Sequence, residues 1–96
     1  MELAFEWDPR KDRANCGKHG ISFSQATTVF GNPLARIFTD EGHSAEERRE
    51  IIVGHSQANG LLLVCFVEPT EGRVRIISAR RATRSEQHEY EDHIKP

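Results

Sequence analysis

The chain has 96 residues, of which 36% are hydrophobic and 29% are charged, and its formal net charge is −2 at pH 7. This size and balance predict one globular domain with a modest core and exclude a disordered chain. No apolar run approaches the ~20 residues of a membrane span, and the amino terminus lacks the pattern of a signal peptide, so we expect a cytoplasmic protein. The slight acidic excess argues against a protein that coats DNA.

The first third of the chain has the pattern of a short strand followed by two helices. Residues 5–7 are the strand candidate. Asp8 and Pro9 predict a helix start, and Gly20 predicts its left-handed end. Ser22 is placed to cap a second helix. The core-facing residues of that helix recur at helical spacing and are Phe23, Ala26, Thr27 and Phe30.

From residue 35 the hydrophobic pattern becomes that of strands. The predicted strands are 35–39, 49–53, 61–67 and 73–79. Asn59 and Gly60 predict a tight hairpin, and the uninterrupted apolar run 61–67 predicts an internal strand that is covered on both faces. Residues 40–47 are expected to form a charged turn that contains a short helical turn.

The last strand leads directly into a helix. Thr83 and Glu86 stand at the spacing of a capping box, which predicts a final helix to about residue 94. Arg80 and Arg81 therefore fall where the strand ends and helix N–H donors begin, a place that favours anions. The alternative is a solvated strand end with ordinary surface arginines.

Helices followed by consecutive strands indicate an α+β fold. We expect residues 1–96 to form a single domain with a small antiparallel β-sheet, two N-terminal helices packed on one face, and a C-terminal helix. The polar first helix and the acidic last helix expose more surface than a small core requires. This surface predicts a stable complex with a small basic or amphipathic partner protein.

Three stretches together resemble the BrnT family of type II toxin–antitoxin toxins. They are Phe5 to Gly20, His43 to Gly54, and Arg75 to Glu91. The resemblance implies a fold similar to that of RelE-like ribonucleases and a metal-independent endoribonuclease that cleaves RNA and blocks translation. It also implies no cofactor, and a BrnA-like antitoxin that neutralises the toxin, forms a hetero-oligomer with it and supplies the only contact with DNA.

RNA cleavage through the neighbouring 2′-OH needs a base, an acid and cations that stabilise the growing phosphorane charge. Arg80 is the first candidate for the charge-stabilising role, because a guanidinium fork holds two phosphate oxygens. Arg49 is the second, matching the family's Glu–Arg element. Its alternative role is a surface ion pair with Glu46 or Glu47.

Two histidines are candidates for proton transfer near neutral pH, His19 and His43. We prefer His19, because Lys18 and Lys11 add positive charge to the same helix. The predicted catalytic set is therefore Arg80, Arg49 and His19, and the predicted RNA-binding set is Lys11, Lys18 and Arg81. The alternative roles are structural: His19 caps its helix, His43 holds the charged turn, and the lysines form a solvated face.

No zinc-binding pattern or glycine-rich phosphate loop is present. A competing hypothesis is an inactive interaction module that only binds an antitoxin-like, DNA-binding partner. A DNA-binding regulator is a weaker third possibility, because no helix-turn-helix carries the basic residues. The hypotheses differ in whether Arg49, Arg80 and His19 converge on one concave face.

Overall fold

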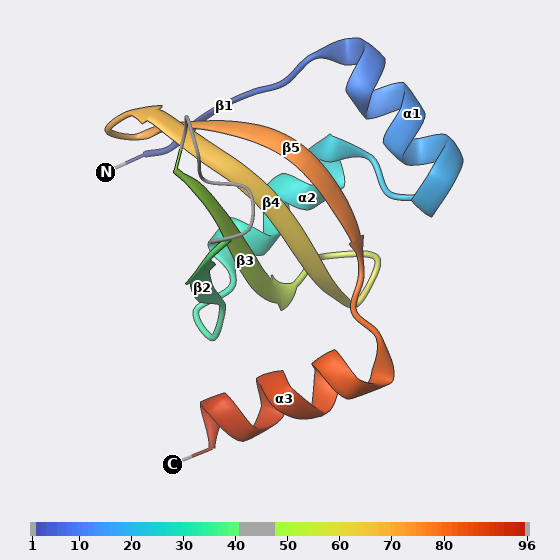
Figure 1. The fold of residues 1–96 in the computed structure, drawn as a ribbon, viewed down its shortest axis with the longest axis vertical. Helices are drawn as coiled ribbons and strands as arrows, with labels where there is room; N and C mark the ends of the chain where they lie inside the picture. The colour runs from blue at the N-terminus through green and yellow to red at the C-terminus, as the bar shows by residue number, and fades with distance from the viewer. Residues whose placement is uncertain (1, 41–47, 96) are drawn as a thin grey trace.

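The computed structural model describes residues 2–40 and 48–95. Five strands form one sheet in the order β1-β5-β4-β3-β2 (Figure 1). The elements in chain order are β1 (Ala4–Glu6), α1 (Pro9–His19), α2 (Phe23–Thr27), the 3₁₀ helix η1 (Thr28–Gly31), β2 (Arg36–Thr39), β3 (Arg49–His55), β4 (Leu61–Thr70), β5 (Arg73–Arg81) and α3 (Arg84–Ile94). None of the described helices is long and apolar enough to cross a membrane. Except for Asp40, the predicted turn 40–47 lies outside the described residues, and so does His43.

The four predicted strands form an antiparallel meander from β2 to β5, and β4 is internal as expected. The prediction of a purely antiparallel sheet is wrong, because β1 adds a fifth strand parallel to β5. Glu6 pairs across this edge with Arg75 at 2.9 Å and with Arg73 at 3.4 Å. A strand of three residues carries almost no sequence signal for its direction, which explains the error.

One face of the sheet packs against α2 and η1. The buried residues of this core are Ile21, Phe23, Ala26, Val29, Ile52, Leu62, Val64, Phe66, Val74, Ile76 and Ala79. Ser22 caps α2 as predicted, accepting from the Gln25 backbone at 3.1 Å. Val29 takes the buried position expected of Thr27, because the chain tightens into a 3₁₀ helix with three residues per turn. Gly54 lets η1 and the segment before β2 approach β3 closely, since a Cβ there would lie 3.1 Å from Cγ1 of Val29 and 2.9 Å from the Cβ of Ala35.

The first helix has the predicted limits. The Asp8 side chain accepts from the Arg10 backbone at 2.8 Å, Pro9 begins the helix, and Gly20 ends it with φ 70°. Only Asn15 of α1 is buried. The helix lies beside β5 (Figure 1), so the expected packing of both N-terminal helices on one face is not confirmed for α1.

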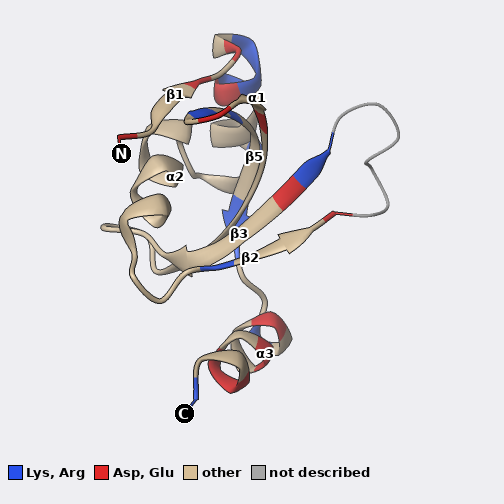
Figure 2. Cartoon of the chain, turned by 90° about the vertical axis from the view of Figure 1, so that its left-hand side faces the viewer, with Lys and Arg blue, Asp and Glu red and all other residues tan. Residues whose placement is uncertain are grey.

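The last helix belongs to the opposite face. The predicted capping box between Thr83 and Glu86 is present. Tyr90 is buried against Val53 and Leu61, in a small cluster separate from the main core. Its hydroxyl donates to the Leu34 carbonyl at 2.8 Å. The acidic helix α3 covers one end of this face (Figure 2), and we call the part that no described helix covers the open face.

Candidate functional site

An extra residue in β5 changes which side chains face each side of the sheet. Cys65 pairs with Ser78 and Phe66 pairs with Ile76, so Ile77 is a bulge. In a regular strand, residues 76, 78 and 80 would share one face. Because of the bulge, Ile76 and Ala79 are both buried in the main core although they are three residues apart. The bulge therefore turns Arg80 toward the open face, a known use of bulges near active sites.

The open face contains a groove of about 450 Å³. Its floor is made by β3, β4 and β5, and the end of α1 forms one wall. The lining residues are Lys18, His19, Asp40, Arg49, Ile51, Leu63, Cys65, Ile77, Ser78, Ala79 and Arg80. This volume lies within the range of sites that hold a small molecule.

The groove brings together the whole predicted catalytic set. Arg49 begins β3, Arg80 lies near the end of β5, and His19 is the last residue of α1. Lys18 lines the same groove beside His19. Lys11 is exposed two turns earlier on α1 and is not part of the lining. Residues far apart in sequence, from one helix and two strands, therefore face one concavity.

The end of α1 is held against β5 by a buried side chain. The amide nitrogen of Asn15 donates to the Ala79 carbonyl at 2.8 Å and to the Ile21 carbonyl at 2.9 Å, and its oxygen accepts from the Ala79 N–H at 3.1 Å. Asn15 thus replaces a neighbouring strand at this edge of β5. Because Ala79 precedes Arg80, these bonds fix the distance between the end of α1 and the arginine.

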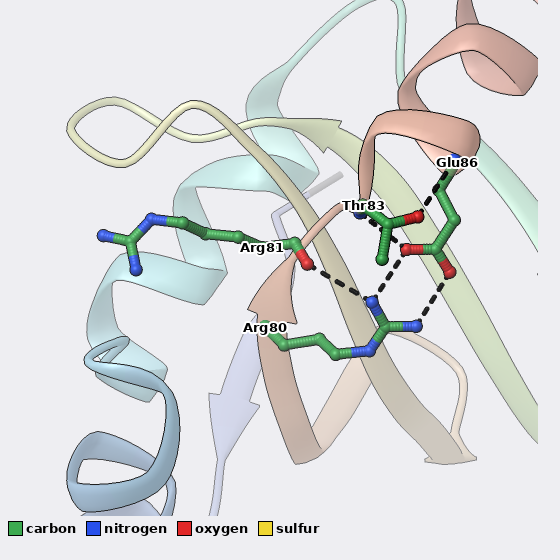
Figure 3. A network of polar contacts seen from close by, with 4 residues as sticks. All are labelled: Arg80, Arg81, Thr83 and Glu86. Atoms are coloured by element: carbon green, nitrogen blue, oxygen red, sulfur yellow. Dashed lines mark hydrogen bonds and ion pairs between the residues drawn. The ribbon is translucent and has the colours of Figure 1, made fainter.

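Arg80 is held by the first turn of α3 (Figure 3). Its Nη1 and Nη2 donate to Glu86 Oε1 and Oε2, each at 2.8 Å, and Nη1 also donates to the Arg81 carbonyl at 3.2 Å. This fork lowers the pKa of Glu86 from 4.5 to about 2, with a backbone bond from Thr83 helping. The same pair raises the pKa of Arg80, which therefore stays cationic.

Arg81 extends away from Arg80 (Figure 3). Its guanidinium donates to the His19 carbonyl and to the Asn59 side chain, both at 3.2 Å. It lies outside the groove lining and ties the end of α1 to the β3–β4 hairpin. Of the predicted RNA-binding residues, only Lys18 lines the groove.

The groove also contains residues that sequence reasoning did not select. Asp40 follows β2, and its backbone donates to the Arg49 carbonyl at 2.9 Å. Cys65 lies half-buried in the floor of the groove. Burial raises the pKa of its thiol most, and the negative charge of Asp40 raises it further, whereas the positive charge of Arg49 lowers it. A polar residue directly after an edge strand was the available signal for Asp40. Cys65 and Ser78 had no such sequence signal, because the face of the sheet on which they lie depends on the strand register.

A second, smaller cleft of about 200 Å³ adjoins the groove beneath α3. Its lining residues are Phe38, Ile51, Val53, Leu63, Glu86, Glu89, Tyr90 and His93. The two clefts share Ile51 and Leu63, so the open face is continuous from the cationic groove to an apolar cleft with an acidic rim. Within the described ranges 2–40 and 48–95, no group of three His, Cys, Asp or Glu residues is placed to hold a metal ion.

Comparisons with known proteins identify the family of the chain and a similar fold. No match was found among curated proteins. The fold is similar to the crystal structure of the Brucella abortus ribonuclease toxin BrnT, with a TM-score of 0.63 and 22% sequence identity, covering 88% of this chain and 99% of that one. The family described as ribonuclease toxin, BrnT, of type II toxin–antitoxin systems matches residues 7–86. Because this match spans most of the 96 residues, the chain belongs to the BrnT family of ribonuclease toxins.

Proposed function

We propose that this chain is an endoribonuclease that cleaves RNA through the neighbouring 2′-OH without a divalent metal. The observation that carries the proposal is the groove, where His19, Arg49 and Arg80 line one open concavity. Two guanidinium groups supply charge for a phosphorane, and an imidazole supplies proton transfer. Cleavage would leave a 2′,3′-cyclic phosphate and a free 5′-hydroxyl.

Each groove residue has one role in this proposal. Arg80 contacts the scissile phosphate, and Arg49 stabilises the same charge from the other side of β4. His19 exchanges a proton with the 2′-OH or with the leaving 5′-oxygen. Lys18 binds a flanking phosphate in the groove, and Lys11 extends that contact along the exposed side of α1. Arg81 contributes to RNA binding from the hairpin side of β5.

We further propose that RNA cleavage blocks translation in the cytoplasm and that a BrnA-like antitoxin neutralises the protein. Membership of a toxin–antitoxin family supports an antitoxin partner. The apolar cleft beside the acidic helix α3 (Figure 2) offers a complementary surface to a basic, amphipathic segment. Contact with DNA would occur only through the antitoxin. Kinship with RelE-like ribonucleases remains a prediction.

The decisive test replaces Arg80 with Ala and with Lys and measures cleavage of a defined RNA in EDTA. Both variants should lose roughly 10²–10³ in rate, because lysine cannot make the bidentate contact. Stability should fall by no more than about 1 kcal/mol, since the pair with Glu86 is partly exposed. Abolition of wild-type cleavage by EDTA would refute the metal-free chemistry. Normal cleavage by a folded Arg80→Ala protein would refute the assignment of Arg80.

The partner prediction has a separate test. Co-expression with the product of the neighbouring gene should give one peak in gel filtration, with an interface of about 1,200 Å² or more. Separate elution of the two proteins would count against it.

The second candidate function is an inactive interaction module. The observation that favours it is the bidentate contact from Glu86, which already occupies one side of the Arg80 guanidinium. Induction of wild type and Arg80→Ala in cells separates the two functions. An active toxin arrests growth only with Arg80 intact, whereas an inactive module leaves growth unchanged in both cases.

A further inference from the structure

The guanidinium of Arg80 is only partly used by the protein. It carries five N–H groups, and three of them donate to Glu86 and to the Arg81 carbonyl. Both of the Nη1 hydrogens and one Nη2 hydrogen account for these bonds. In the part of the chain that the structure describes, Nε–H and the second Nη2–H donate to no protein acceptor. These two hydrogens lie on the same edge of the guanidinium, the edge formed by Nε and Nη2.

We infer that Glu86 is a positioning residue for the proposed ribonuclease reaction: it holds the Nη1–Nη2 end of Arg80, so that the Nε–Nη2 edge is presented to a phosphate oxygen pair in the groove. This inference rests on the proposed function. One planar guanidinium has two forks, and each can hold two oxygens of a separate anion. The carboxylate therefore orients the arginine without occupying the edge that would bind RNA.

The carboxylate of Glu86 is also held by contacts that do not involve Arg80. Its Oε1 also accepts from the Thr83 backbone at 2.8 Å, and the Glu86 backbone donates to the Thr83 hydroxyl at 3.1 Å. Tyr90 anchors the same helix one turn later. A side chain held at its helix start can restrict Arg80 at little further cost in entropy. Preorganising a group that contacts the reacting phosphate accelerates the step more than it changes binding.

Two substitutions separate orientation from overall charge. Glu86→Gln keeps the capping contact, because glutamine is also a favourable residue at this helix position, but it removes the two-oxygen fork. Glu89→Gln makes the same change of charge one turn later on the acidic helix, where the side chain lines the apolar cleft. No hydrogen bond or ion pair joins Glu89 to Arg80 among the described residues. Thermal melts of both variants verify folding.

The experiment combines side-chain ¹⁵N NMR of Arg80 with steady-state cleavage kinetics. The Arg80 Nε–H signal is assigned by its absence in Arg80→Lys. It should shift when a fully 2′-O-methylated oligoribonucleotide is added, since that probe cannot be cleaved. In Glu86→Gln we expect fast rotation of the guanidinium, a kcat lower by roughly 10–10²-fold, and a KM within about threefold of wild type. Glu89→Gln should match the wild type within about twofold in both constants.

Two outcomes would overturn the inference. Tighter binding or faster cleavage by Glu86→Gln than by Glu89→Gln would mean that the carboxylate competes with phosphate. Equal behaviour of the two variants would mean that only overall charge matters. If the wild type neither binds nor cleaves RNA, the proposed function fails separately. The rotation of the Arg80 guanidinium, measured with inorganic sulfate, then still decides the question: loss of restriction only in Glu86→Gln supports orientation, and unchanged rotation refutes it.

Discussion

The two faces of the sheet are built from the same strands but are closed in different ways. Leu62, Val64 and Phe66 of β4 face α2 and η1 and are almost fully buried. Leu63 and Cys65 alternate with them, point to the other face and remain partly exposed. The first face is a buried, apolar core, whereas the second carries a charged groove with α3 over one end.

This difference separates stability from chemistry. The described core of the α2 face is a cluster of apolar side chains with the buried Asn15 at its edge, so close packing there can supply most of the folding free energy. The open face is then free to hold cations and half-exposed polar groups that would be costly in a closed core. The comparison predicts that substitutions on the two faces affect different observables.

The largest expected effect is on the α2 face. Phe23 has no exposed surface, and its replacement by alanine should lower the free energy of unfolding by about 3–5 kcal/mol. The matched substitution on the other face, Tyr90→Phe, removes only the hydroxyl bond to Leu34 and should cost about 1 kcal/mol. Urea denaturation measures both. Cleavage per folded molecule should be unchanged in Phe23→Ala, and a loss beyond the unfolded fraction would contradict the separation of the two faces.

A smaller effect is expected where the two faces meet. Asn15→Ala would leave both backbone groups of Ala79 without their partner, at a cost of about 1–3 kcal/mol. Unlike Phe23→Ala, it should also slow cleavage, because the end of α1 would no longer be fixed beside Arg80. Arg13→Ala, on the exposed surface of α1, is the control for helix content. An Asn15→Ala protein with normal hydrogen exchange at the Ala79 amide would refute the proposed restraint.

The parts of the fold that depend on local chemistry could be predicted from the sequence. The Asp8 and Thr83 caps, the Gly20 helix end and the apolar run 61–67 all act within a few residues of their own position. The parallel pairing of β1 with β5 could not be predicted, because three residues contain no information about a partner 67 or more positions away.

The candidate site was predictable in its residue types but not in its geometry. Cationic motifs and an arginine fork identified Arg49, Arg80 and His19 as candidates. Their shared groove depends on the bulge at Ile77, which moves the side chains that follow it in β5 to the opposite face of the sheet. No residue type in this stretch predicts such a bulge. Asn15 was missed for a similar reason: an asparagine in a polar helix looks solvated until the edge of β5 lies against it.

The smallest expected effect concerns acid. The folded-state pKa of Glu86 is about 2, below its ordinary value of 4.5, so the folded protein binds fewer protons than the unfolded chain between these values. The contribution of Glu86 is therefore complete above pH 4.5 and is lost as the pH falls toward 2. Since Arg80 is 41% exposed, the contribution at neutral pH should not exceed about 1 kcal/mol.

The measurement is the difference in unfolding free energy between wild type and Glu86→Gln from pH 7 to pH 2. Glu6 is also paired and has a lowered pKa, but its effect cancels because both proteins contain it. The difference should shrink toward zero with falling pH, and Glu89→Gln should show no such trend.

Because the α2 face buries no titratable group in the described core, hydrogen exchange should show α3 amides opening in acid before those of β4. Simultaneous opening of both would mean that the two faces do not unfold independently.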